Sequence, residues 1–141
     1  MTAAADEHDV AEQILRSFRR VAVVGISDNP DRPSFGVASY LRAAGFEIVP
    51  VNPNLSAWEG LPCYASLRDI PASIEVVDIF RRSELVEPVV DEAIAIGARA
   101  VWMQDGVINP AAAAKARTAG LLVVMDRCML RDHRALRARD T

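Results

Sequence analysis

Short, mostly apolar runs recur along the chain, and the segments between them place apolar residues at helical spacing. Apolar runs of this length, ended by glycine or polar residues, are typical of strands buried on both faces of a sheet. The runs comprise residues 21–24, 47–51, 75–80, 100–103 and 121–125. We therefore predict five short strands.

Capping residues mark the ends of the helical segments. An amphipathic helix over about residues 8–19 precedes the first strand. Ser34 is the expected N-cap of a second helix that ends at Gly45. Two further helices are expected over residues 87–96 and after Asn109-Pro110, a pair in the preferred order of N-cap and first helical residue.

The connection between the second and third strands carries the weakest helical signal. Only residues 66–70 look helical there, with Ser66 and Asp69 spaced as the acidic variant of a capping box. Residues 50–62 are rich in proline and are expected to form a loop. Strands that alternate with helices imply right-handed crossovers and a parallel sheet. We predict an α/β fold: a Rossmann-like, doubly wound sheet of about five parallel strands in three α/β/α layers.

Length and composition fit one globular domain. The chain has 141 residues, of which 51% are hydrophobic and 25% charged. We assign residues 8–136 to a single domain, residues 1–7 to a disordered N-terminal tail and residues 137–141 to a C-terminal tail. The net charge of −3 provides no basic excess, so neither nucleic acid nor a membrane surface is an expected partner.

The N-terminal residues lack the pattern of a secretory signal, and no apolar stretch is long enough to span a bilayer, so we expect a cytoplasmic protein. Cys63 and Cys128 are far apart and form no CxxC pair, which suggests neither a disulfide framework nor a zinc site. No cluster has metal-ligand spacing, and no metal is expected.

Ligands of doubly wound sheets bind beyond the C-terminal ends of the strands. The first such loop, residues 25–36, departs from the dinucleotide motif G-x-G-x-x-G but suits a phosphate. Glycine allows a sharp turn or a close approach, hydroxyls and helix N–H groups donate hydrogen bonds, and arginine adds positive charge. The residues concerned are Gly25, Ser27, Arg32, Ser34 and Gly36. The alternative is a polar surface loop with a capped helix.

The loops after the next strands narrow the class of ligand. A NAD domain places an acidic residue after its second strand to hold the ribose, whereas this chain has Asn52 there. Asn52 can bond a ribose or adenine edge, or Asn52-Pro53 can simply form a turn. Arg81 and Arg82 follow the third strand and suit a phosphate, and Gln104 ends the fourth strand within reach of a ligand.

Six segments together closely resemble the small bacterial CoA-binding-domain proteins, which are similar to the CoA-binding domain of the succinyl-CoA synthetase alpha subunit. The segments are residues 21–27, 32–37, 49–53, 78–83, 100–104 and 124–128, and the resemblance runs from about Arg20 to Leu136. It departs from the family pattern at Ile26, where a small residue is usual, and at Asp105, where relatives are uncharged.

The resemblance implies a ligand, coenzyme A or acyl-CoA, and a set of contacts. By this resemblance, Gly25, Ile26 and Ser27 meet the phosphates, and Arg32 and Ser34 flank them. Asn52 and Pro53 border the nucleotide, and Phe80, Arg81 and Arg82 close the site. The ligase relatives carry a phosphorylated histidine in a second domain, and neither His8 nor His133 can replace it. Acyl-CoA synthesis is therefore not expected.

We expect a carrier, sensor or regulatory partner of acyl-CoA metabolism without a visible catalytic set. One alternative is an enzyme, either an NAD(P)-dependent oxidoreductase or an acyl transferase that uses Cys128; no general base is evident beside Cys128, and packing is its simpler role. Another is a protein-interaction subunit, and the sequence leaves open whether the chain forms a homodimer. Asp78, inside an apolar strand, must find hydrogen bonds or lie at an edge.

Overall fold

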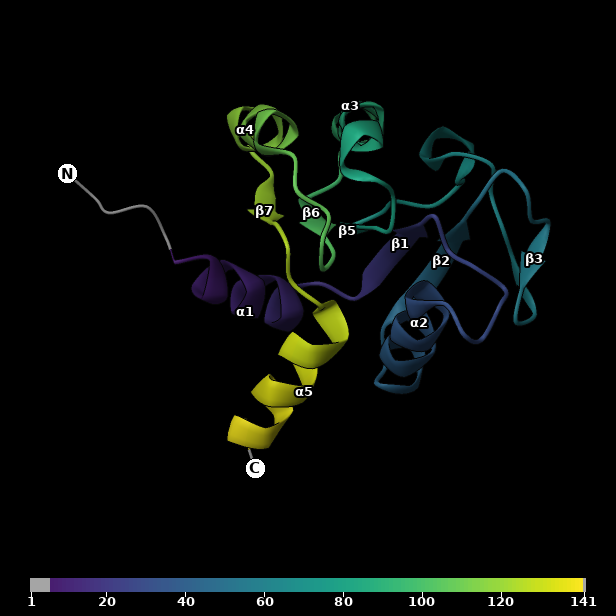
Figure 1. Cartoon of the computed structure of the whole chain (residues 1–141), viewed down its shortest axis with the longest axis horizontal. Coiled ribbons are helices and arrows are strands. Elements are labelled where there is room, and N and C mark those ends of the chain that lie inside the picture. Colours follow the sequence, from purple (N-terminus) through teal and green to yellow (C-terminus); the bar gives the residue numbers. More distant parts are fainter. Residues whose placement is uncertain (1–5, 141) are drawn as a thin grey trace.

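Five parallel strands form one sheet in the order β2-β1-β5-β6-β7 in the computed structural model, which describes residues 6–140 (Figure 1). The strands are β1 (Arg20–Val24), β2 (Glu47–Val51), β5 (Val76–Ile79), β6 (Ala100–Met103) and β7 (Leu122–Val124). In the register, Val21 lies between Ile48 of β2 and Val76 of β5. The prediction of a five-stranded, parallel, Rossmann-like α/β fold is confirmed.

Helices cover both faces of this sheet. On one face lie α1 (Glu7–Ser17), α2 (Pro33–Ala43) and α5 (Met129–Asp140), and on the other lie α3 (Val86–Ala95) and α4 (Pro110–Thr118) (Figure 1). A short 3₁₀ turn, η2 (Ser83–Leu85), leads into α3. Within residues 6–140, no helix combines the length and the apolar character that crossing a bilayer requires.

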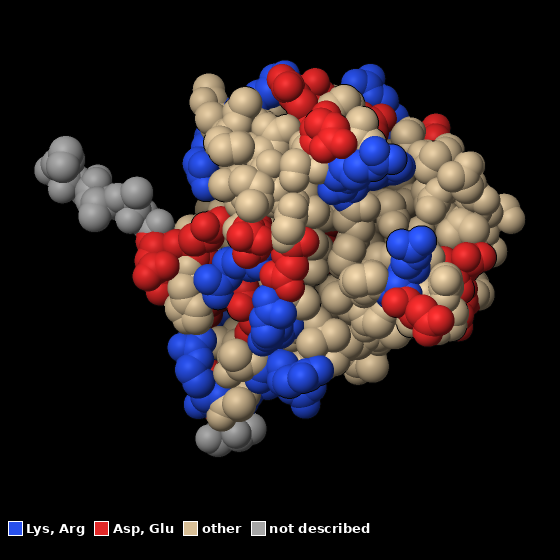
Figure 2. Space-filling view, viewed as in Figure 1, with Lys and Arg blue, Asp and Glu red and all other residues tan. Residues whose placement is uncertain are grey.

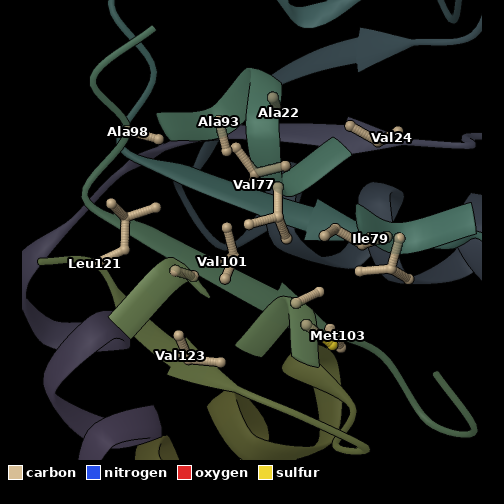
Figure 3. Close-up of a cluster of buried hydrophobic side chains, with 14 of the residues drawn as sticks. Ala22, Val24, Val77, Ile79, Ala93, Ala98, Val101, Met103, Leu121 and Val123 are labelled. Carbon is tan, nitrogen blue, oxygen red and sulfur yellow. The ribbon is translucent and has the colours of Figure 1, made fainter. Parts of the chain in front are cut away.

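The core consists of two hydrophobic clusters, one on each face of the sheet. Side chains of a strand point to alternate faces, so Val21 and Val23 join the cluster under α1, α2 and α5, whereas Ala22 and Val24 join the cluster under α3 and α4. Figure 3 shows the second cluster, in which Ala93 of α3 packs with strand residues such as Val77. Burial on both faces explains why the strands are mostly apolar.

Asn109 caps α4 as predicted, because its side chain accepts a hydrogen bond of 3.0 Å from the Ala112 N–H and Pro110 follows at the first helical position. The prediction that Ser34 caps α2 is wrong. Arg32 occupies the N-cap position, because Pro33 has no N–H to lose and starts the helix two residues earlier than expected. The Ser34 hydroxyl is buried instead and accepts a hydrogen bond from the Ser27 N–H, at 2.9 Å.

The segment between β2 and β5 holds more structure than the expected loop. A small antiparallel hairpin joins β3 (Ala57–Trp58) to β4 (Leu61–Pro62) through Glu59 and Gly60, which both have positive φ. The helical signal at 66–70 becomes a single 3₁₀ turn, η1 (Leu67–Asp69). It has no capping box, because the Ser66 hydroxyl donates to the Asp69 carboxylate, at 3.0 Å, and caps no N–H group.

Both expected tails require correction. The first helix begins at Glu7, because the Asp6 side chain accepts a hydrogen bond from the His8 N–H and caps it; residues 1–5 lie outside the described part. It ends at Ser17, where the chain extends into β1. At the other end, residues 137–140 continue α5.

Packing and ion pairs hold α5 in place. Leu136 is buried in the core, and the ring of His133 packs edge-on against Tyr40 and Phe46. Exposed ion pairs join α5 to α1: Arg16 with Asp140 at 3.0 Å and Arg139 with Glu12 at 3.1 Å. Acidic and basic side chains are accordingly intermixed over α1 and α5 in Figure 2.

Candidate functional site

The strand order places a topological switch point at the C-terminal ends of β1 and β5. From β1 the chain first moves to β2 at one edge of the sheet and then returns to β5 on the other side of β1. The connections after β1 and β5 therefore leave on opposite faces, which opens a crevice between them. Gly25, after β1, and Phe80, after β5, flank this crevice.

A cavity of about 660 Å³ opens at this edge of the sheet. Predicted site residues that line it are Gly25, Ile26, Ser27, Arg32, Ser34, Asn52, Phe80 and Gln104. Lining residues that we did not assign to the site are Asp28, Pro33, Val37, Asn54, Leu55, Asp105, Val107 and Cys128. The predicted residues Gly36, Pro53, Arg81 and Arg82 do not contribute to this lining.

The first loop of the cavity is held in shape by side chains from three segments. The Ser27 N–H donates to the Ser34 hydroxyl, the Asn52 Nδ2 donates to the Ile26 carbonyl at 2.7 Å, and the Trp58 indole donates to the Ser27 carbonyl at 2.9 Å. Trp58 belongs to the hairpin that the sequence did not predict. The loop conformation is therefore fixed by the protein itself.

This fixed loop presents hydrogen-bond donors without acceptors. Within residues 6–140, the main-chain N–H groups of Ile26 and Ser34 have no hydrogen-bond partner. Ser34 lies in the first turn of α2, where N–H groups carry partial positive charge. The Arg32 guanidinium lines the same wall and pairs with no carboxylate of the described residues. Together these groups suit an anion such as a phosphate.

Gly25 allows two backbone segments to meet closely at the site. It has a φ of +85°, and a Cβ at this position would lie 2.2 Å from the Phe80 carbonyl oxygen. The backbones after β1 and β5 therefore meet closely at the switch point, which only glycine permits. Gly36 differs, because a Cβ there meets no protein atom within 4 Å. No other part of the described chain therefore approaches Gly36 closely, and its close approach to a ligand stays a prediction.

Asn52 uses its side chain within the protein. Its Nδ2 holds the Ile26 carbonyl, and its Oδ1 accepts a hydrogen bond from the Asn54 N–H at 2.8 Å. The turn role that we left open is therefore present. Asn52 also lines the cavity, so a contact with a nucleotide stays a prediction.

The opposite end of the cavity is formed by the segments after β6 and β7. Gln104 is buried, and its Oε1 accepts a hydrogen bond from the Met129 N–H at 3.2 Å. Asp105 forms a two-pronged ion pair with Arg131, at 2.8 and 2.9 Å. Cys128, in the segment after β7, is half-buried. In the sequence, this end was signalled by Gln104 at the end of the fourth strand, by the acidic residue Asp105 and by the Cys128 thiol.

The two arginines after β5 lie beside the cavity. Arg82 is exposed and forms a loose ion pair with Glu84, at 3.9 Å. Arg81 is half-buried and forms no ion pair within residues 6–140. Contact of either residue with a ligand stays a prediction. No group of three or more His, Cys, Asp or Glu side chains in the described part of the chain is arranged to hold a metal ion.

Asp78 lies in the middle of the sheet, between Val23 of β1 and Trp102 of β6. It is fully buried, and neither carboxyl oxygen has a hydrogen-bond partner among residues 6–140. Our expectation of hydrogen bonds or an edge position is therefore wrong. Burial raises the pKa of this carboxyl well above its usual range, which favours its protonated form.

Comparisons with known proteins agree with this arrangement. YneT of Bacillus subtilis (strain 168), an uncharacterized protein, is 39% identical over 118 residues, which are 84% of this chain and 87% of that protein. A hypothetical protein from Pyrococcus horikoshii OT3 of known structure has a TM-score of 0.88 at 39% identity, with 96% of this chain and 97% of that chain covered.

The expected relation to CoA ligases is also found. The ADP-forming acetate–CoA ligase II of Archaeoglobus fulgidus is 34% identical over 91 residues, which are 62% of this chain but 14% of the ligase. The model of a protein family described as a CoA binding domain matches residues 19–134. That match spans the sheet, the cavity and the first half of α5. The chain therefore belongs to the CoA binding domain family.

Proposed function

We propose that this chain binds coenzyme A or an acyl-CoA in the cavity at the switch point. The observation that carries the proposal is the set of unpaired donors at the loop after β1: the N–H groups of Ile26 and Ser34 and the guanidinium of Arg32. Such donors suit the phosphates of the ligand for which the family is named. The volume of about 660 Å³ lies in the range of small-molecule sites.

The pantetheine arm, in this proposal, extends toward Gln104 and Cys128. These residues line the same cavity as the phosphate loop but come from the far side of the switch point. NAD is a poorer candidate, because β2 ends in Val51 and is followed by Asn52, so no carboxylate stands ready to hold a ribose.

The role that we propose is that of a carrier, sensor or regulatory partner in acyl-CoA metabolism. The matched part of the ligase is 14% of its length, so the ligase reaction itself has no support in this chain. A second candidate function is binding of another protein by the Rossmann-like domain. One observation supports it: the apolar side chains of Leu85 and Ile108, after β5 and β6, are both 47% exposed.

Calorimetry with CoA, dephospho-CoA and NAD tests the binding proposal. We expect CoA to bind, dephospho-CoA to bind more weakly because it lacks one phosphate, and NAD not to bind. Equal binding of all three, or binding of none, contradicts the proposal.

Arg32→Ala tests the phosphate loop. Loss of a charge-assisted hydrogen bond should weaken CoA binding by about tenfold and reduce the dependence of affinity on salt. Arg117→Ala, which removes an exposed arginine from α4, is the matched control and should bind CoA like the unchanged chain. Unchanged affinity of Arg32→Ala excludes that side chain from the site. Arg81→Ala and Arg82→Ala test in the same way whether these side chains reach the bound ligand.

A further inference from the structure

Cys128 stands at the start of a helix and at the wall of the cavity. Its carbonyl oxygen accepts a hydrogen bond of 2.9 Å from the Asp132 N–H, four residues along, which makes Cys128 the N-cap residue of α5. Cys128 is one of the residues that line the cavity, together with Gly25 and Ser34, and it also packs against the core cluster under α1, α2 and α5. It therefore borders the proposed CoA site.

An unused hydrogen-bond donor accompanies this thiol. Gln104 is only 4% exposed and lines the cavity, and its Oε1 is held by the N–H of Met129, the neighbour of Cys128. No residue among 6–140 accepts a hydrogen bond from its Nε2. Among residues 6–140, only the Asp78 carboxyl oxygens are fully buried side-chain atoms without a partner, so the Gln104 Nε2 is open to the cavity and can donate to an acceptor atom of a ligand.

The first turn of α5 adds positive potential at the same point. The N–H groups of Leu130 and Arg131 have no acceptor in the described part of the chain. The pKa of the Arg131 guanidinium lies above its ordinary value, chiefly because of its hydrogen bonds with Asp105 and also because of the charge of an ionised Cys128. Unpaired N–H groups at a helix N-terminus favour the thiolate, the nucleophilic form of cysteine, whereas the charge of Arg131 is already paired with that of Asp105.

We propose, on the basis of the CoA-binding function above, that Cys128 accepts the acyl group of an acyl-CoA bound in the cavity. The thiolate attacks the thioester carbonyl carbon and forms a new carbon–sulfur bond. The bond between that carbon and the CoA sulfur then breaks, and CoA leaves as a thiolate that takes a proton from water. One thioester replaces another, so the step needs no oxidant or further reactant.

Gln104 has the position to assist this step. The carbonyl oxygen of the thioester gains negative charge during the attack, and a fixed amide donor stabilises that charge. Exchange of Cys128 with a disulfide would develop no charge on oxygen and would leave the Gln104 amide unused. A chain acylated on Cys128 would be a carrier that holds its acyl group covalently.

The experiment incubates the full chain with acetyl-CoA and follows it by intact mass spectrometry and peptide mapping. We expect one acetyl group on Cys128, released by neutral hydroxylamine, and none on Cys128→Ser. Cys63→Ser is the matched control, because Cys63 is also half-buried but lies outside the cavity lining, and it should be acetylated like the unchanged chain. A small acetyl thioester without a nucleotide should react far more slowly.

Gln104→Met, which keeps the volume of the side chain but removes the donor, should slow acetylation by about 100-fold. CoA affinity, measured by calorimetry on the same variant, should fall by much less than this rate. Equal loss of both quantities shows a structural role only. Binding of CoA without acetylation of Cys128, or equal acetylation of Cys63, overturns this inference alone. Absence of CoA binding by the unchanged chain overturns the proposed function instead.

Discussion

Gly25 is required by the protein before any ligand arrives. Its φ of +85° is unfavourable for other residues, and a Cβ would lie 2.2 Å from the Phe80 oxygen. Gly25→Ala should therefore lower the free energy of unfolding by about 2 to 4 kcal/mol, from backbone strain and from the forced separation of two strand ends. Denaturant titration of the purified variant measures this change.

Gly120→Ala separates the two causes. Gly120 has a similar φ of +92°, but a Cβ there meets no atom within 4 Å. Only the strain applies, so the cost should be about 1 to 2 kcal/mol. If both variants lose the same stability, the close approach to Phe80 contributes nothing, and only the positive φ requires glycine at position 25.

Asp78 should make stability depend on pH. Its pKa in the folded chain is raised by burial, so the contribution of this carboxyl to stability is greatest below the pKa of the unfolded chain, about 4, and is lost as pH rises toward the folded pKa. In that window the unfolded chain releases a proton that the folded chain retains. The free energy of unfolding should fall by about 1.4 kcal/mol for each pH unit.

Asp78→Asn removes this dependence, because the amide does not ionise. Urea titrations at pH 4.5 and pH 7 should show that the variant gains stability relative to the unchanged chain as pH rises. Glu84→Gln, at an exposed carboxyl, serves as the control and should show no such gain. A constant difference between Asp78→Asn and the unchanged chain at both pH values contradicts a protonated Asp78.

At the scale of elements, α5 was the helix that the sequence did not reveal. Among its twelve residues only Met129 and Leu136 are buried, and the remainder are largely charged. That stripe is too narrow for a hydrophobic pattern to show, and the helix depends on its contacts with α1 and α2. The hairpin β3–β4 was hidden for a related reason, because strands of two residues have no detectable periodicity.

The strands of the sheet were predicted almost to the residue. Burial on both faces gave each one an apolar run, as in β2 and β6, where the predicted and observed bounds agree. The cap of α4 was predicted, because the Asn109 side chain decides it. The cap of α2 was missed, because Pro33 starts that helix and the Ser34 hydroxyl is used by the Ser27 N–H instead. Local chemistry is thus readable from sequence, whereas hydrogen bonds between distant segments are not.

The dependence of α5 on packing leads to a prediction at Leu136. This side chain is 5% exposed and belongs to the cluster under α1, α2 and α5. Leu136→Ala should therefore cost about 2 to 4 kcal/mol of stability. Leu85→Ala, at a side chain that is 47% exposed, should cost under about 1 kcal/mol. Thermal and chemical unfolding compare the stability of the two variants. Equal effects would mean that packing of the last turns of α5 does not contribute to stability.

At the scale of the whole molecule, the location of the site followed from topology alone. Alternation of strands and helices places every βα loop at one edge, and the first of these loops does line the cavity. The far wall was harder to predict. Gln104 and Cys128 are 24 positions apart, and their neighbourhood depends on the bond between Gln104 and Met129 and on a helix that the pattern did not reveal.

Ligand binding at this edge should protect the molecule unevenly from hydrogen exchange. Saturation with CoA at about 100 times Kd stabilises the native state by about 2.7 kcal/mol, which slows exchange of the core amides that open only on global unfolding. Amides that exchange by local opening respond only if the ligand touches them. We therefore expect marked slowing in residues 25–36 and 126–131, and no change in the loops at 97–99 and 119–121 on the opposite edge of the sheet.

Mass spectrometry of the exchanged peptides, with and without CoA, measures this pattern. A second, smaller cavity of about 210 Å³ lies along β2 and is lined by residues such as Ile48 and Tyr64. Slowing confined to peptides around that cavity would move the ligand away from the switch point. Slowing at both 25–36 and 126–131 indicates one ligand that spans the crevice, because these segments follow β1 and β7, which β5 and β6 separate in the sheet order β2-β1-β5-β6-β7. A long ligand, with phosphates at one end and a thiol at the other, meets that requirement.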